Sequence, residues 1–210
     1  MSGTLIKICG LSTPETIAAA VGSGASHVGL VHFAKSPRHL SLSDAAVLRR
    51  LLPAHVKAVL LVVNPAPESL TEAVRTIAPD VVQFHGAETP DALARFRAET
   101  GIEAWRAMAV RDAASLADVA RFRGAADRVL LDAPASSLPG GNGTAFDWSL
   151  LAGWQAPVAW GLAGGLTPAN VADAIRLTRA PLVDTSSGVE SAPGLKDVDK
   201  IAAFCKAARL

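Results

Sequence analysis

The chain has 210 residues, of which 50% are hydrophobic and 19% charged, and its formal net charge is +1. Such a chain can bury a sizeable core, so the composition argues against disorder. The near-neutral charge gives no general attraction to nucleic acid or to acidic membranes, so we expect neither partner. Any anionic ligand must then be held by a local site.

The two cysteines, Cys9 and Cys205, form neither a CxxC pair nor an evenly spaced framework, which excludes a disulfide scaffold and a zinc site of that type. No apolar stretch reaches the roughly 20 residues of a membrane helix. The first residues lack a charged segment followed by an apolar run, the pattern of a signal peptide. These features predict a cytoplasmic protein with reduced cysteines.

Eight short apolar runs, rich in Val, Ile and Leu, alternate with longer segments of helical period. They show little polar alternation, which is typical of strands buried on both faces. The predicted strands are Leu5–Cys9, Val28–Phe33, Val56–Val63, Val81–Phe84, Glu103–Ala109, Arg128–Asp132, Val158–Leu162 and Leu182–Thr185.

The segments between these runs carry helix start signals, in which Ser, Thr or Asp caps the helix and Pro often follows. A short helix is also predicted near Asp147–Leu151, and a last helix at Leu195–Ala207. The predicted starts are Thr13-Pro14, Ser41, Thr89-Pro90, Asp112 and Thr167-Pro168.

Alternating strands and helices imply a parallel sheet with right-handed crossovers, and eight units imply closure into a (β/α)8 barrel, the TIM barrel. The rival α/β fold is an open, doubly wound sheet. Its usual glycine-rich first turn is absent, because Cys9-Gly10-Leu11-Ser12 does not match GxGxxG. Since no linker or break in composition is visible, we expect residues 1–210 to form a single domain.

Two glycine-containing loops follow the seventh and eighth predicted strands, where such barrels commonly bind phosphate. The first contains Gly164 and Gly165, and the second contains Ser186, Ser187 and Gly188. Glycines let the backbone approach a ligand closely, and helix starts point N–H groups at an anion. Either loop alone could be only a tight turn, but together they favour a phosphate site.

Two reactive side chains end strands on the same rim, where the active sites of such barrels lie. Cys9 ends the first strand and Asp132 ends the sixth. A thiolate can take a proton from carbon, and a carboxylic acid can donate one to a ring oxygen. Taken singly, Cys9 could be a buried small hydrophobe and Asp132 a capping residue. Cys205, in the last helix, is expected to serve packing.

Two further candidates lie near this rim. Arg38 could bind a carboxylate bidentately, or it could be a solvated surface arginine. His85 could contact substrate or only orient the loop backbone. The sequence contains no HExxH, P-loop, serine-nucleophile elbow or clustered metal ligands. We therefore predict proton-transfer chemistry on a sugar phosphate, with no metal and no cofactor.

Eight short motifs follow one another along the chain: Lys7–Leu11, Lys35–Arg38, Val82–Gly86, Leu131–Ala133, Phe146–Trp148, Leu162–Leu166, Val183–Glu190 and Gly194–Asp197. In these motifs the sequence resembles the phosphoribosylanthranilate isomerase family along nearly its whole length. Each shared motif is modest by itself, but their order and spacing are specific. The chain departs from the family pattern at His32-Phe33-Ala34 and at Gly140-Gly141-Asn142-Gly143.

The resemblance implies an Amadori rearrangement of a small phosphoribosyl substrate in tryptophan biosynthesis, performed by a monomer or homodimer. It implies that Asp132 is the general acid, Cys9 the general base, and Arg38 the group that holds the anthranilate carboxylate. Two alternative functions would have other signatures in the sequence. The histidine-pathway isomerase resembles a two-aspartate design with a half-barrel repeat, which this chain lacks. A non-catalytic phosphosugar-binding barrel could lose Cys9 or Asp132, yet both are present.

Overall fold

The computed structural model describes residues 3–134 and 146–209, so the Gly140–Gly143 segment lies outside the described residues. Eight parallel strands close into a barrel in the order β1 to β8, with β8 paired to β1. The predicted (β/α)8 barrel is thereby confirmed. The strands are β1 (Leu5–Cys9), β2 (His27–Val31), β3 (Lys57–Val62), β4 (Val81–Phe84), β5 (Glu103–Ala109), β6 (Arg128–Asp132), β7 (Trp160–Leu162) and β8 (Leu182–Thr185).

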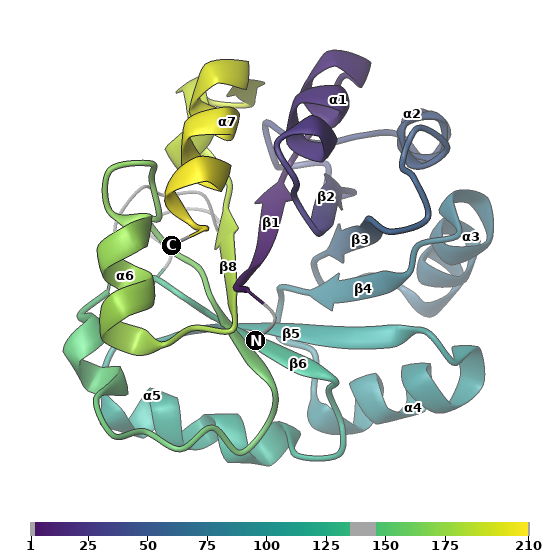
Figure 1. The fold of residues 1–210 in the computed structure, drawn as a ribbon. Coiled ribbons are helices and arrows are strands. Elements are labelled where there is room, and N and C mark those ends of the chain that lie inside the picture. Colours follow the sequence, from purple (N-terminus) through teal and green to yellow (C-terminus); the bar gives the residue numbers. More distant parts are fainter. Residues whose placement is uncertain (1–2, 135–145, 210) are drawn as a thin grey trace.

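Helices surround the strands as an outer layer, and α7 lies beside α1, which closes this layer (Figure 1). Short 3-10 helices, labelled η, occur in three of the connections. The helices are α1 (Pro14–Gly22), α2 (Leu42–Arg49), α3 (Pro67–Ile77), α4 (Pro90–Thr100), α5 (Ala113–Ala117), η1 (Asp118–Phe122), η2 (Trp148–Leu151), α6 (Val171–Thr178), η3 (Ser187–Val189) and α7 (Val198–Ala207).

The strands separate two apolar layers. Outward-facing residues such as Ile6 and Ile8 pack with helix residues such as Phe204. Inward-facing residues fill the barrel around the buried Trp105, and Leu5 packs against them. Because side chains alternate along a strand, burial on both faces requires a continuous apolar run, which is why the sequence shows little polar alternation.

Four of the predicted helix starts are confirmed, each with a side-chain cap. The side chains of Thr13, Ser41, Thr89 and Asp112 each accept a hydrogen bond from an N–H group in the first turn. The short predicted helix at Asp147–Leu151 is the 3-10 helix η2.

The predicted start at Thr167-Pro168 is wrong, because α6 begins at Val171 after the N-cap Asn170. The Thr167 N–H donates to Asn170 Oδ1 at 2.8 Å, and Asn170 Nδ2 donates to the Gly165 carbonyl at 3.0 Å. These bonds hold a polar turn ahead of the helix and tie it to the loop after β7.

The last helix was predicted at Leu195–Ala207. The observed helix α7 begins three residues later, at Val198. The preceding segment instead forms β10 (Leu195–Lys196), which pairs antiparallel with β9 (Glu190–Ala192). Asp197 then caps α7 by accepting two N–H groups of its first turn. This small hairpin follows the loop after β8 and brings Lys196 toward the barrel rim.

Three predicted strands are longer than those observed. The strand expected at Val56–Val63 spans Lys57–Val62. The strand expected at Val28–Phe33 ends at Val31, because the chain turns where the Ser36 N–H donates to the Phe33 carbonyl at 2.8 Å. The strand expected at Val158–Leu162 begins only at Trp160.

At the amino ends of β2, β4 and β6, the side chain of the residue just before the strand accepts a hydrogen bond from the preceding strand in the chain. Ser26, Asp80 and Asp127 precede β2, β4 and β6. Their side chains accept the N–H groups of Ile6, Ala58 and Ala104, at 3.0, 2.7 and 2.8 Å. Each of these N–H groups belongs to an odd-numbered strand, so each cap joins two neighbouring strands.

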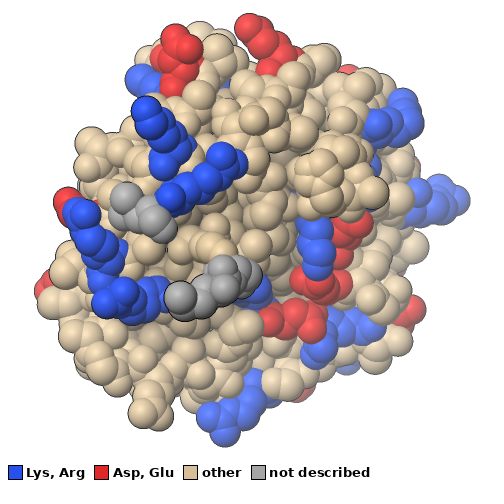
Figure 2. Space-filling view, in the orientation of Figure 1, with Lys and Arg blue, Asp and Glu red and all other residues tan. Residues whose placement is uncertain are grey.

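Charged side chains of both signs are scattered over the face drawn in Figure 2, in keeping with the net charge of +1. Among the described residues, no helix is long and apolar enough to cross a membrane.

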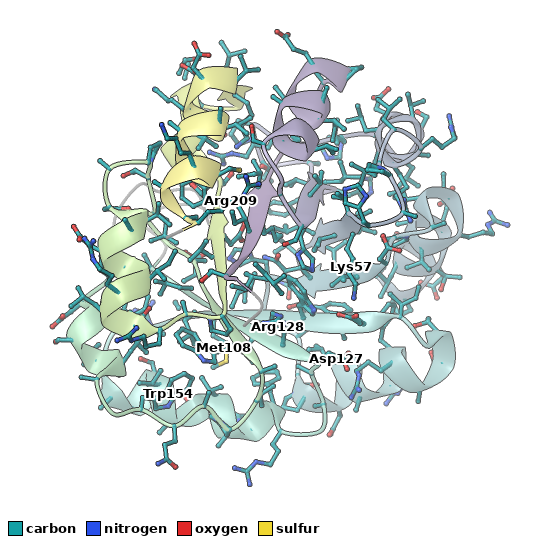
Figure 3. The ribbon with its side chains drawn as sticks, in the orientation of Figure 1. Lys57, Met108, Asp127, Arg128, Trp154 and Arg209 are labelled. Atoms are coloured by element: carbon teal, nitrogen blue, oxygen red, sulfur yellow. The ribbon has the colours of Figure 1, made fainter. Side chains whose placement is uncertain are left out.

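The caps generate a stability prediction for Asp127, which Figure 3 labels beside Arg128 at the start of β6. Asp127 Oδ1 also accepts from Arg97 of α4 at 2.6 Å. In Asp127→Ala the buried Ala104 N–H loses its acceptor, so we expect a loss of about 1–3 kcal/mol in the free energy of unfolding. Urea denaturation measures it.

The control is Asp173→Ala, which breaks an exposed pair with Arg176 and should change stability by less than about 0.5 kcal/mol. Because amino-end residues of such barrels serve stability, turnover of the folded Asp127→Ala protein should stay near that of the parent. Equal stability losses in both variants would contradict a specific role for the cap.

Candidate active site

One pocket at the carboxyl ends of the strands contains every site residue predicted from the sequence. It lies on the rim where the loops after the strands meet, which is the usual place of the active site in this architecture. Its lining includes Cys9, Arg38, His85, Asp132, Gly164, Gly165, Ser186, Ser187 and Gly188.

Cys9 ends β1 and is 5% exposed, so only a small part of its side chain reaches the pocket. It packs against Gly29 of β2. A Cβ on Gly29 would lie 2.8 Å from Cys9 Sγ and 2.9 Å from Cys9 Cα. Any larger residue there would displace the thiol, so the glycine keeps the space that Cys9 occupies.

Asp132 ends β6 and is held by two neighbours. Its Oδ1 accepts from the Ala133 N–H at 2.8 Å, and its Oδ2 lies 3.4 Å from His85 Nε2. Nδ1 of His85 is buried without a partner among the described residues. His85 thus contacts the proposed acid directly, rather than only the loop backbone.

The loops after β7 and β8 have the backbone geometry of an anion site. Gly164 and Gly165 have φ values of +78° and +66°, a region that favours glycine. A Cβ on Gly188 would lie 1.9 Å from the Leu166 carbonyl oxygen, so the two loops touch through this glycine. Thr185 Oγ1 also joins them, donating to the same carbonyl at 2.7 Å.

Main-chain N–H groups in these two loops are available to a ligand. Those of Gly164, Gly165 and Ser187 donate to no acceptor within residues 3–134 and 146–209. Clustered, unpaired N–H groups form a concave site for an anion. The geometry therefore suits a phosphate group at this side of the pocket.

Arg38 lies on the pocket rim but is already bound to a carboxylate of the protein. Its Nε and Nη2 donate to the two carboxylate oxygens of Glu190, at 2.6 and 2.8 Å. Lys196 Nζ donates to the same carboxylate at 2.6 Å. Burial acts to raise the pKa of Glu190, but these two cations hold it below its ordinary value. Glu190 therefore stays ionised and fixes the orientation of the guanidinium.

Sequence reasoning missed several polar groups around the pocket. Gln83 of β4 lines it, is 1% exposed, and has an Oε1 without a partner in the described part of the chain. Lys7 lies inside the barrel on β1, and Asp184 of β8 accepts a hydrogen bond from it. Gln83 and Lys7 each stand two residues before a predicted site residue, His85 and Cys9. That spacing, which puts side chains on one face of a strand, was the available signal.

The chemistry of the set is that of proton transfer. It combines a thiol, a carboxylic acid and a histidine with main-chain donors for an anion. Among the described residues, no three His, Cys, Asp or Glu side chains gather in a way that could hold a metal ion.

The fold and this pocket define a (β/α)8-barrel protein with a candidate anion site and candidate acid and base groups on one rim. Residues 6–207 match the family model of N-(5'-phosphoribosyl)anthranilate (PRA) isomerase. The chain belongs to this family, which confirms the family predicted from the sequence.

The sequence and the structure of this chain match related proteins over nearly the full length. The N-(5'-phosphoribosyl)anthranilate isomerase of Erythrobacter litoralis is 64% identical over 206 residues, covering 98% of this chain and 99% of that protein. The solved phosphoribosyl anthranilate isomerase of Thermotoga maritima has a TM-score of 0.89 and 36% identity, with 98% of each chain covered.

A further solved phosphoribosyl anthranilate isomerase is in complex with reduced 1-(o-carboxyphenylamino)-1-deoxyribulose 5-phosphate. It has a TM-score of 0.86 and 35% identity, with 98% of each chain covered.

The contact between the loops after β7 and β8 generates a binding prediction. In Gly188→Ala the new Cβ would push the Leu166 carbonyl away and displace the neighbouring N–H groups. We expect the affinity for ribose 5-phosphate, measured by calorimetry, to fall about tenfold or more. The matched control is Gly22→Ala in α1, where a Cβ would meet nothing within 4 Å. Equal affinities in both variants would contradict the assignment of the anion site.

Proposed function

We propose that this chain converts N-(5'-phosphoribosyl)anthranilate into 1-(2-carboxyphenylamino)-1-deoxyribulose 5-phosphate, an aldose–ketose isomerisation in tryptophan biosynthesis. Family membership gives the reaction. The observation that carries the residue roles is the shared pocket, which has Cys9, Asp132 and both glycine loops in its lining.

The pocket has surfaces suited to each end of this substrate. The phosphate would lie against the N–H groups of the loops after β7 and β8. Arg38 would bind the anthranilate carboxylate through its Nη1, which donates to no acceptor among the described residues, while Glu190 holds Nε and Nη2. The aromatic ring would lie on an apolar wall, which consists of Val31, Phe33, Leu61 and Val63.

The first chemical step would use Asp132 as general acid. Its carboxylic acid gives a proton to the furanose ring oxygen, the bond between C1 and that oxygen breaks, and the nitrogen lone pair forms a C=N bond to C1. His85 lies against the carboxyl of Asp132 and would help to hold it at the ring oxygen.

The second step would use Cys9 as general base. Its thiolate removes the proton from C2 of the Schiff base, whose electrons form the C1=C2 bond of an enolamine. Tautomerisation then gives the ketone, with a proton added at C1. The reaction is an isomerisation, so no redox cofactor is needed.

We further propose that residues 1–210 form one domain that acts in the cytoplasm as a monomer or homodimer. Both cysteines are free thiols, which fits a reducing compartment. The described helices pack around a single closed ring of strands.

The roles of Cys9 and Asp132 are tested by Cys9→Ser and Asp132→Asn. Each variant loses one proton-transfer group but keeps the anion loops. We expect kcat to fall about 10²–10⁴-fold, while affinity for ribose 5-phosphate changes little. The loss of phosphoribosylanthranilate fluorescence gives the rate. Cys205→Ala, in α7 outside the pocket lining, should keep its turnover per folded molecule.

Near-normal turnover in both site variants would overturn the acid and base assignment. The substrate is tested separately, by running the histidine-pathway aminoaldose in parallel with phosphoribosylanthranilate. We expect turnover of phosphoribosylanthranilate and none of the histidine-pathway substrate. Turnover of the histidine-pathway substrate alone would overturn the proposed function.

A further inference from the structure

Lys7 is a lysine with no exposed surface, and it lies inside the barrel beneath the candidate active site. It is 0% exposed and does not line the pocket. Side chains alternate along a strand, so Leu5, Lys7 and Cys9 of β1 point to the same side. Leu5 packs in the apolar layer inside the barrel, and Cys9 lines the pocket above. Lys7 therefore stands between the apolar interior and the thiol.

The ammonium group of Lys7 is paired with one carboxylate. Its Nζ donates to Asp184 Oδ2 at 2.8 Å, and the two residues are register partners on β1 and β8. Asp184 lines the pocket, and its Oδ1 has no partner among the described residues. On the other side Lys7 pairs in register with His27 of β2. Burial, together with nearby cations including Lys7, lowers the pKa of His27 to about 3, so this imidazole is neutral near pH 7.

A buried ion pair of this kind usually adds little to the free energy of unfolding. Removing two charges from water costs several kcal/mol per ion, and replacement by apolar residues is often neutral or stabilising. The neighbouring layer around Trp105 is mostly apolar, although His27 and Arg128 also lie against the Trp105 ring, and methionine at position 7 would suit its apolar part. The charge at this position therefore calls for an explanation other than the stability of the fold.

The charged groups around Cys9 supply that explanation. Burial raises the pKa of the Cys9 thiol above its ordinary value, and Asp184 acts in the same direction. Lys7 opposes both, as does Lys196, whose Nζ donates to Ser186 Oγ at 3.1 Å. Ser186 in turn donates to the Cys9 carbonyl at 3.1 Å.

Three other ionisable groups, Arg38, His85 and Asp132, line the same pocket. Lys7 and Lys196 are the cations that act directly on the Cys9 pKa, and Lys7 has the larger effect.

We infer that Lys7, held in place by Asp184, is a positioning residue that stabilises the thiolate of Cys9 and so sets the pH range in which Cys9 can accept a proton. The inference rests on the proposed function, because only a base needs its thiolate at neutral pH. Thiolate formation can nevertheless be measured without substrate, so the two proposals fail separately.

The experiment measures the alkylation rate of Cys9 by iodoacetamide as a function of pH. Cys205→Ala provides the parent, because Cys9 is then the one thiol in the chain. In this parent, Lys7→Met should move the midpoint of the rate profile upward by about 1–3 pH units. Lys7→Arg keeps the charge and should restore most of the shift. Lys57→Met, which removes a half-exposed lysine paired with Glu103, is the matched control and should leave the midpoint unchanged.

Asp184→Asn gives a second test with the opposite sign. It removes a negative charge beside the thiol, so the midpoint should move downward. Loss of structure would expose the thiol and could not produce opposite shifts in Lys7→Met and Asp184→Asn.

If Lys7→Met does not fold, the double variant Lys7→Met/Asp184→Asn removes both charges together. Its midpoint should lie above that of the parent, because Lys7 acts on the Cys9 pKa more strongly than Asp184 does.

An unchanged midpoint in folded Lys7→Met, or in the double variant where the single one does not fold, would overturn the inference. In an active enzyme, the acidic limb of the kcat/KM profile should shift by the same amount as the alkylation midpoint. If the parent turns over phosphoribosylanthranilate but the midpoint does not move, the inference fails and the proposed function stands. If the midpoint moves in a parent without that turnover, the proposed function fails and the effect of Lys7 on the thiolate remains.

Discussion

The pairing of β8 with β1 is the constraint on which the rest of the molecule depends. Four register pairs, from Leu5 with Leu182 to Ile8 with Thr185, join the two ends of the sheet into a ring. The same pairing puts Lys7 opposite Asp184, and the loop after β8 then reaches the end of β1, where Ser186 donates to the Cys9 carbonyl. Barrel closure, the buried ion pair and the contact between the proposed base and the anion loop thus arise from one set of backbone hydrogen bonds.

Local and periodic signals were sufficient for most of the fold. A strand buried on both faces must be apolar throughout, so its position can be found without knowing its partners. Helix caps are equally local, as the Thr13 and Asp112 side chains show. The site residues were predictable for a related reason, because parallel strands in a closed barrel all end at one rim. Polar residues at strand ends, such as Cys9 and Asp132, therefore line the same pocket.

Interactions between distant segments could not be predicted. Arg38 and Glu190 are 152 residues apart, and nothing near either residue indicates that they pair. A helix over Leu195 and Lys196 gives no reason to expect Lys196 near the site. The observed hairpin instead places its Nζ within hydrogen-bond distance of Ser186, a residue of the pocket lining. The role of Lys7 could not be predicted for a different reason. Nothing near Lys7 in the sequence indicates a role for a lysine in an apolar strand. Its partner, Asp184, lies on the neighbouring strand β8, 177 residues further along the chain.

The side-chain caps at the amino ends of the strands also bear on how the chain divides into parts. Ser26, Asp80 and Asp127 bind β2 to β1, β4 to β3, and β6 to β5. The first three quarters of the barrel are thus built from successive two-stranded modules, each carrying its own internal cross-link. A cut made between β2 and β3 leaves every such cross-link inside one fragment, whereas a cut between β1 and β2 splits one across two fragments. The borders between modules are therefore the natural places to divide this barrel for fragment complementation or to recombine it with a relative.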